Sequence, residues 1–379
     1  MIPVNDPLFT ETDLANLTAA FRSGWISSAG EYLERFETAW AGYCGAAHGI
    51  AVTNGTTALD IAVESLSLAP GDEVILPSFT IISCAAAIVR AGAVPVLVDS
   101  EPRTWCMDVA QIEARITPRT RAIMAVHIYG HPVDMEALLS IASRHGLVVI
   151  EDAAEAHGAE VSMKGSTGAS EWHRAGGIGH IATFSFYANK LVTTGEGGMI
   201  VTSDPILAAR CRSLRNLGFQ SQRRFVHEVL GTNARMTNLQ AAIGVSQVER
   251  MAEIVERKRW MGRAYEMRLG GLNTIELQVQ EEWSRSVYWV FGLVLADHVP
   301  FDAVELAARL RERSVETRPF FVGMHEQPVL QHLGLFGTGE HYPVAERIAR
   351  RGLYVPSGLA ITESQIDAVS AALTEVLTS

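Results

Sequence analysis

The sequence predicts an α/β fold with a mostly parallel sheet, and three observations support this prediction. Short apolar runs alternate with helical patterns along much of the chain. Polar residues follow several of these runs, and beyond about residue 237 the pattern changes to a smaller α+β unit. Strands that alternate with helices favour parallel pairing, with helices covering both faces of the sheet.

Seven apolar runs have the composition of strands. They are residues 49–52, 73–76, 94–98, 122–126, 148–150, 182–186 and 198–201. Helices are expected between several of them, most clearly at 57–68 and 135–145. In sheets of this kind ligands bind beyond the carboxyl ends of the strands, so the polar residues that follow the runs are candidate site residues.

The C-terminal third has a different pattern. A long helical stretch runs from about 237 to 269, and the chain then shows a strand-like run at 287–296 and helical patterns at 301–313 and 363–377. We place the domain boundary near residue 250. This predicts a large domain at 1–250, including an N-terminal arm, and a smaller domain at 251–379.

Composition and charge exclude several classes of protein. The chain has 379 residues, a formal net charge of −11, 48% hydrophobic residues and 19% charged residues. An acidic, ordinary globular composition disfavours general binding to nucleic acid or anionic membranes, which select basic surfaces. The longest stretch without charged residues or histidine, between Glu73 and Arg90, is shorter than the roughly 20 apolar residues of a membrane span. Without a visible secretory signal, a cytoplasmic location is expected.

The cysteines and histidines indicate no metal site. The four cysteines form no CxxC pair, and the histidines are scattered without a metal-ligand pair such as HxxxH on a helix. Buried, reduced thiols are therefore expected.

Asn54-Gly55-Thr56-Thr57 follows the first strand-like run and opens a helix. Glycine lets the backbone approach a ligand, and the free N–H groups of a helix start suit a phosphate, with threonine hydroxyls as further donors. The same residues also suit a simple glycine turn with a threonine cap. Both interpretations stay open from the residues alone.

Asp152 and Lys190 are candidate catalytic residues. Asp152 ends a buried run, where a carboxylate needs a cation or several donors; it could face a protonated ring nitrogen or form a cap or structural ion pair. Lys190 lies between an apolar run and a glycine-rich turn. Partial desolvation there would lower the amine pKa from about 10.4 and improve it as nucleophile or base, whereas the alternative is a solvated surface lysine.

Residues 177–182, Gly-Ile-Gly-His-Ile-Ala, match the G-x-G-x-x-A pattern of dinucleotide-binding loops. That fingerprint requires a strand before it and a helix after it. Here a polar, loop-like segment precedes the glycines and a strand-like run follows them, so we expect no dinucleotide site.

Taken together, these motifs resemble the DegT/DnrJ/EryC1 family of pyridoxal-phosphate-dependent nucleotide-sugar aminotransferases, which have fold type I. The resemblance rests on GWISS at 24–28, NGTTAL at 54–59, VHIYGHPVDM at 126–135, EDAAEAHGA at 151–159, FSFYANKLVTTGEGGM at 184–199, RMTNLQAAIG at 235–244 and VPSGLAIT at 355–362. It implies a mostly parallel seven-stranded sheet in the large domain and a smaller α+β C-terminal domain.

The resemblance also implies roles for the candidate residues. Lys190 would hold pyridoxal 5'-phosphate as a Schiff base and move a proton, while Asp152 would pair with the pyridinium nitrogen and keep it protonated. Glu155 would lie near the 3-hydroxyl of the cofactor. The implied phosphate contacts are Gly55, Thr56, Ser185 and, from the neighbouring subunit, Asn233. A homodimer with shared active sites follows.

Three positions depart from the family pattern. Ile81 replaces an aromatic residue that stacks on the cofactor in many relatives, Glu155 replaces glutamine, and Ala234 replaces tyrosine. A carboxyl group at 155 would raise the pKa of the Schiff base. We have no account of Ala234 from the sequence.

The segment TRPFFVGMHEQP at 317–328 resembles the perosamine-synthase branch of the family. The implied substrates are L-glutamate and a nucleoside-diphosphate 4-keto-6-deoxyhexose, best matched by GDP-4-keto-6-deoxymannose, in a ping-pong reaction. Candidate substrate-binding residues are Trp25, His325 and Arg318, with Arg223 or Arg224 from the partner subunit; surface charge is the alternative for the arginines. A 3-keto sugar, a dehydratase or a non-catalytic regulatory protein are the alternative functions, although Lys190 disfavours the dehydratase, whose relatives carry histidine there.

Overall fold

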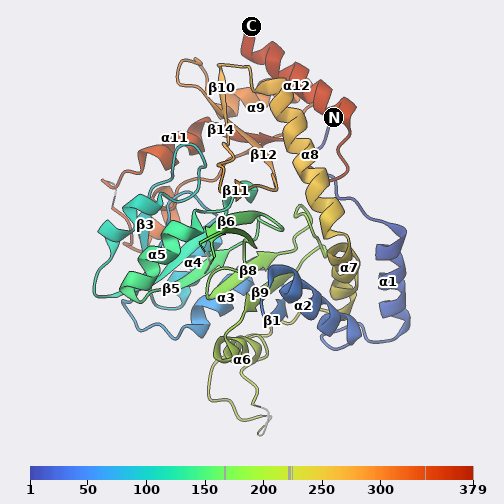
Figure 1. Cartoon of the computed structure of the whole chain (residues 1–379), viewed down its shortest axis with the longest axis vertical. Helices are drawn as coiled ribbons and strands as arrows, with labels where there is room; N and C mark the ends of the chain where they lie inside the picture. Colours follow the sequence, from blue (N-terminus) through green and yellow to red (C-terminus); the bar gives the residue numbers. More distant parts are fainter. Residues whose placement is uncertain (166–167, 221–222, 224, 338, 379) are drawn as a thin grey trace.

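The computed structural model describes residues 1–165, 168–220, 223, 225–337 and 339–378. In Figure 1 a larger lower part contains the central sheet, and a smaller upper part contains the C-terminal helices and both chain termini. No helix of the described residues is long and apolar enough to cross a membrane.

Among the described residues, the central sheet has seven strands in the order β1-β9-β8-β5-β4-β2-β3. They are β1 (His48–Val52), β2 (Glu73–Pro77), β3 (Val94–Val98), β4 (Thr120–Val126), β5 (Val148–Asp152), β8 (Ile181–Ser185) and β9 (Gly198–Thr202). β9 runs antiparallel to both of its neighbours, and the other pairs are parallel. The predicted mostly parallel sheet is therefore confirmed.

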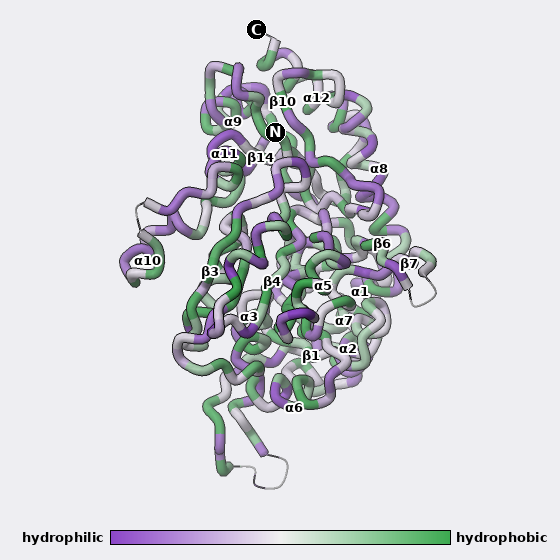
Figure 2. The backbone as a smooth tube through the Cα atoms, turned by 60° about the vertical axis from the view of Figure 1, so that its left-hand side comes forward, coloured by the Kyte–Doolittle hydropathy of each residue, from purple (hydrophilic) through white to green (hydrophobic). Residues whose placement is uncertain are grey.

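Helices of the N-terminal two thirds surround this sheet. They are α1 (Glu11–Arg22), α2 (Glu31–Cys44), α3 (Gly55–Ser65), α4 (Ile82–Arg90), α5 (Met135–His145), α6 (Pro205–Leu214) and α7 (Asn238–Glu249). α3 contacts β8 and β9, and α2 packs against β1 and α7. The strands are almost wholly buried, and in Figure 2 green, hydrophobic segments mark their course, for example at β3 and β4.

The C-terminal part has its own antiparallel sheet, in the order β10-β12-β14-β13. Its strands are β10 (Ile275–Leu277), β12 (Phe291–Leu295), β13 (Arg318–Pro319) and β14 (Gly352–Val355). Its helices are α8 (Met251–Leu269), α9 (Ala303–Glu312), α10 (Pro328–His332), α11 (Pro343–Arg351) and α12 (Glu363–Thr378). A second apolar core, including Leu293, Leu306 and Leu373, fills this part.

A third, small sheet joins the two parts of the chain. β11 (Ser284–Arg285) pairs with β6 (Glu160–Lys164), which pairs with β7 (Ser170–Arg174). The larger apolar core also includes residues from beyond 250, such as Phe320 and Ile348. The domain boundary near residue 250 thus stays a prediction.

Two elements differ from the sequence-based expectation. The helical stretch from 237 to 269 is broken at Arg250, whose backbone (φ −105°, ψ 12°) leaves the helical region between α7 and α8. Its guanidinium group contacts Asp13 at 3.6 Å and Glu253 at 3.1 Å. The strand expected at 287–296 is shortened to β12, because Tyr288 has a left-handed backbone (φ 45°) that ends the extended conformation.

The glycines at 177 and 179 lie in a loop between β7 and β8, so the dinucleotide pattern has strands on both sides. This loop surrounds the buried carboxylate of Glu151. The carboxylate accepts hydrogen bonds from the N–H groups of Gly176 at 2.7 Å, Ile178 at 2.8 Å and Gly179 at 2.5 Å, and from His127 Nε2 at 2.9 Å. A Cβ atom at Gly177 would collide with the Cys44 carbonyl oxygen, so the loop needs glycine there for close packing.

Candidate active site

A cavity of about 630 Å³ lies at the carboxyl ends of the parallel strands. Its lining combines the start of α3, the end of β5 and the segment after β8 with residues of the C-terminal part. Predicted site residues among the lining are Gly55, Thr56, Ile81, Asp152, Glu155, Ser185 and Lys190; Trp289, Phe321 and Tyr354 complete the wall. Residues distant in sequence therefore meet where ligands bind in such sheets.

The start of α3 forms an anion-binding cradle. Asn54 caps the helix by accepting a hydrogen bond from the Thr57 N–H at 2.8 Å. A Cβ atom at Gly55 would lie 2.7 Å from Ser185 Cβ, so only glycine allows β8 to approach the helix this closely. The Thr56 hydroxyl lies 2.8 Å from the Ser83 hydroxyl. Helix N–H groups and three hydroxyls gathered in this way suit a phosphate.

Asp152 ends β5 with its carboxylate almost completely buried. Its Oδ1 accepts from the Ala154 N–H at 3.1 Å, and its Oδ2 accepts from the Cys84 thiol at 3.1 Å. Burial, together with the charge of Asp152, raises the pKa of the Cys84 thiol, which therefore stays protonated and can donate. No sequence motif indicates this thiol, which lies on α4 and also contacts Thr80 Oγ1 at 3.3 Å.

Lys190 and Glu155 form a buried pair. Lys190 Nζ lies 3.8 Å from Glu155 Oε1 and 3.6 Å from the centre of the Trp289 ring. Burial lowers the pKa of Lys190, although the carboxylates of Glu155 and Asp152 partly oppose this effect. Burial likewise raises the pKa of Glu155, against the charge of Lys190. The amine is thus closer to its neutral, nucleophilic form than a surface lysine.

The backbone of Tyr129 forms a hydrogen bond with the Glu155 side chain. Its backbone N–H donates to Glu155 Oε2 at 2.8 Å, from a left-handed backbone conformation (φ 56°) that is unfavourable for tyrosine. Its buried ring packs against Phe320, with ring centres 4.7 Å apart, and against Phe321 at 5.5 Å. Packing therefore holds the strained backbone in place. Tyr129 follows the strand-like run at 122–126, but the sequence did not indicate this role of its backbone N–H.

The remaining predicted residues do not line this cavity. Trp25 is exposed, Arg318 pairs with Glu316 at 2.7 Å, and Arg223 pairs with Glu228. Arg224 lies outside the described residues. Asn233 is exposed and accepts from Arg235 at 3.3 Å. Their roles stay predictions.

His325 is buried away from the cavity lining. Its Nδ1 lies 2.8 Å from the Ser78 hydroxyl and its Nε2 lies 3.2 Å from Glu346 Oε1. The structure thus places it in a polar cluster beside β2, and a contact with substrate stays a prediction.

Ala234 has a physical explanation in the structure. The residue is buried, its N–H donates to the Arg215 carbonyl at 2.9 Å, and its carbonyl accepts from the Thr53 N–H at 2.9 Å. A tyrosine side chain has no room at this position unless its neighbours move.

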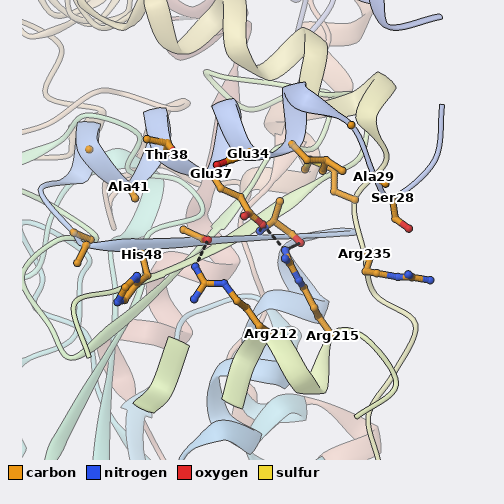
Figure 3. Close-up of a pocket in the computed structure, with 18 residues that line it drawn as sticks. Ser28, Ala29, Glu34, Glu37, Thr38, Ala41, His48, Arg212, Arg215 and Arg235 are labelled. Atoms are coloured by element: carbon orange, nitrogen blue, oxygen red, sulfur yellow. Dashed lines mark hydrogen bonds and ion pairs between the residues drawn. The ribbon is translucent and has the colours of Figure 1, made fainter. Parts of the chain in front are cut away.

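A second cavity, of about 670 Å³, lies between α2, β1 and α6 (Figure 3). Arg212 and Arg215 point into it, but Arg215 is paired with Glu37 and also donates to the Ala51 carbonyl at 2.7 Å. Arg212 reaches the Gly49 carbonyl at 3.5 Å. This cavity contains neither a lysine nor the strand-end carboxylates, so it lacks the chemistry of the first.

Comparisons with known proteins agree with the geometry. The model of the DegT/DnrJ/EryC1/StrS aminotransferase family matches residues 7–374. A GDP-perosamine synthase from Caulobacter vibrioides is 44% identical over 93% of this chain and 92% of its own length. A GDP-perosamine synthase from Escherichia coli O157:H7 is 38% identical over 96% and 95%. The crystal structure of Streptomyces venezuelae DesV in complex with a ketimine intermediate superposes with a TM-score of 0.87 at 35% identity, covering 97% of this chain and 94% of that one.

The fold, together with the family model and the named relatives, identifies the class of protein as an aminotransferase. The chain belongs to the DegT/DnrJ/EryC1/StrS aminotransferase family. The predicted fold and the predicted class of enzyme, a sugar aminotransferase, are confirmed.

Proposed function

We propose that this enzyme transfers the amino group of L-glutamate to a nucleoside-diphosphate 4-keto-6-deoxyhexose, with GDP-4-keto-6-deoxymannose as acceptor and GDP-perosamine as product. The convergence of Lys190, Asp152 and Gly55 on one cavity carries the proposal. Relatives named GDP-perosamine synthase, which align over nearly the whole chain, support the choice of sugar.

The family implies pyridoxal 5'-phosphate as cofactor, and the residues present fit it. The helix-start cradle of Gly55, Thr56 and Ser185 would hold the phosphate, and Asp152 would face the ring nitrogen. When bound, this group supplies an electron sink and also carries the amino group between two half-reactions, which makes the reaction ping-pong.

The chain's own residues would manage protons and charge. The Lys190 amine, desolvated in the cavity, would take a proton from one carbon and return it to another. Hydrogen bonds to both oxygens of Asp152 would hold its carboxylate in one orientation. Glu155 would balance the ammonium form of Lys190 from 3.8 Å away.

We also propose a homodimer with shared active sites. Asn233, expected at a phosphate, is exposed and lies outside the cavity of its own chain. The described residues between α6 and α7 extend outward from the lower part of the molecule (Figures 1 and 2). Their apolar side chains Phe225, Val226, Val229 and Leu230 are exposed, and Leu230 is 97% exposed. A group of exposed apolar side chains favours contact with a second copy.

The test combines a lysine variant with a panel of acceptors. In Lys190→Ala the enzyme should lose transamination with glutamate and the borohydride-reducible link to the cofactor, whereas Lys164→Ala, at an exposed lysine, should retain both. Retained transamination in Lys190→Ala would refute the assignment.

The sugar is tested by adding nucleotide 4-keto and 3-keto sugars to the enzyme after it has reacted with glutamate. Recovery of the starting spectrum with GDP-4-keto-6-deoxymannose supports the proposal. Recovery only with a 3-keto sugar, or a product that has lost a hydroxyl group, would support the alternative acceptor or the dehydratase.

A further inference from the structure

The sequence contains only three lysines, Lys164, Lys190 and Lys258, beside 28 arginines. Lys164 is exposed, Lys258 is buried, and 10% of the Lys190 side chain is exposed. Lys190 and Lys258 both contact the same residue, Trp289. This arrangement is independent of the cofactor, since it is made from side chains of the chain itself.

The Trp289 ring is the nearest partner of the Lys190 amine. Nζ lies 3.6 Å from the ring centre, and no hydrogen bond joins it to any residue that the structure describes. The face of an indole ring is electron-rich and attracts an ammonium group more strongly than other aromatic rings do. The ring therefore offers Lys190 a defined resting position in the cavity wall, beside the Glu155 carboxylate.

Trp289 is fixed from both ends. Its indole N–H donates to the carbonyl of Asn189 at 2.9 Å, which ties the ring to the residue before Lys190. Its own carbonyl accepts from Lys258 Nζ at 2.9 Å, and Lys258 also donates to the Ser357 carbonyl. Lys258, on α8, thus joins the segment before β12 to the segment after β14. Burial lowers the pKa of Lys258 to about 7. Its two carbonyl partners satisfy the buried amino group and account for its position.

Four groups influence the charge of Lys190 from the elements packed around it. The carboxylates of Glu155 and Asp152 and the face of Trp289 favour the ammonium form. His157 is buried, and burial lowers its pKa to about 3, so it stays neutral. Burial of Lys190 itself opposes these attractions.

We propose that Trp289 is a positioning residue for Lys190, receiving its amino group on the indole face whenever that group is not bonded to the cofactor, and that Lys258 fixes Trp289 for this task. The inference rests on the proposed function for its catalytic meaning. An amine released during turnover stays within the cavity and can be protonated there, so it is ready to return the proton.

The test uses cofactor-free protein labelled with ¹⁵N at Nζ of lysine. Three lysines give three signals, and Lys190→Arg and Lys258→Arg identify two of them by their loss. The pKa of Lys190 should be highest in the parent protein, lower in Trp289→Phe and lowest in Trp289→Leu. We expect the leucine variant to lower it by about one unit. Lys258→Met should lower it by about half as much, while the Lys164 signal stays constant as an internal reference.

A geometric readout separates positioning from a general loss of structure. In the parent protein the Lys190 Hε protons should be shifted upfield by the Trp289 ring current, and Trp289→Leu should abolish this shift. If the leucine variant does not fold, the phenylalanine variant decides. An unchanged pKa and unchanged Hε shifts in a folded variant would overturn the inference.

A kinetic arm distinguishes this inference from the proposed function. With cofactor and glutamate, Trp289→Leu should slow the first half-reaction about tenfold and move its pH profile downward. Failure of Lys190→Ala to abolish transamination would sink the proposed function. If Trp289→Leu lowers the Lys190 pKa but leaves the rate of the first half-reaction unchanged, the positioning role is overturned and the proposed function is not.

Discussion

Replacing Glu151 with glutamine should destabilise the protein without changing a residue that lines the candidate active site. The Glu151 carboxylate accepts from four donors, the N–H groups of Gly176, Ile178 and Gly179 and the Nε2–H of His127. His127 must present N–H to it, because its Nδ1 accepts from the Val133 N–H at 3.0 Å. A glutamine oxygen can serve only two of these donors, and its amide group would face the other two.

The cost follows from this count. A hydrogen bond to a charged group contributes about 1.5–3 kcal/mol, so two lost bonds predict a loss of about 3–6 kcal/mol. With an unfolding entropy of about 2.1 cal/mol/K per residue, this lowers the Tm by about 5 °C. Thermal unfolding of cofactor-free protein at fixed concentration measures the change. Glu256→Gln, at an exposed surface ion pair, is the matched control and should change Tm by less than about 1 °C.

The pH dependence gives an independent check. Burial would raise the pKa of Glu151, but hydrogen bonds from His127 and the glycine amides outweigh it, so the pKa is lowered. A lowered folded-state pKa contributes stability above the unfolded value of about 4.3 that is lost as pH falls through the folded value. The difference between parent and variant should therefore be complete at pH 7 and shrink in acid. A Tm difference below about 1 °C at pH 7, or one that grows in acid, would refute the reasoning.

Three further outcomes are expected. Cys84→Ala removes the thiol donor from Asp152 and should cost about 1–3 kcal/mol in urea unfolding, while Cys84→Ser restores a donor and most of the stability; equal values for the two would contradict the hydrogen bond. Gly177→Ala drives a methyl group into the Cys44 carbonyl and should cost about 2–4 kcal/mol, against a neutral or slightly stabilising Gly271→Ala in open space. Glu155→Gln removes a carboxylate beside Lys190, so the visible absorbance of the loaded enzyme should titrate at lower pH than in the parent; an unchanged titration would show that Glu155 is neutral there.

The sheet was predictable because its strands are short, continuous apolar runs. Such runs are typical of strands buried on both faces, and polar residues mark where each one ends. The break at Arg250 was not predictable, since good helix formers continue through it and its contact with Asp13 comes from α1, far away in sequence. Helices α1 and α2 and the small β11-β6-β7 sheet have no counterpart among the predicted elements. The β6 and β7 strands are short and rich in polar residues, so their pattern is weak.

The candidate site was predictable where one strand end or helix start carries the chemistry. Gly55 begins α3, Asp152 ends β5, and Lys190 lies in the segment after β8. The roles of Cys84 and Tyr129 were not predicted, because a thiol hydrogen bond and a strained backbone N–H leave no motif. Trp289 was missed as a neighbour of Lys190 because 99 positions separate them in the chain and only tertiary packing brings them together.

The scarcity of lysine has a practical consequence for handling the protein. Lys164 on β6 is exposed and Lys258 is buried, whereas Lys190 lines the cavity. In the loaded enzyme, where Lys190 would be bonded to the cofactor, an amine-reactive dye or resin should couple at Lys164 and the N-terminal amine. Under the proposed function, the loaded enzyme should then stay active when it is immobilised through lysine.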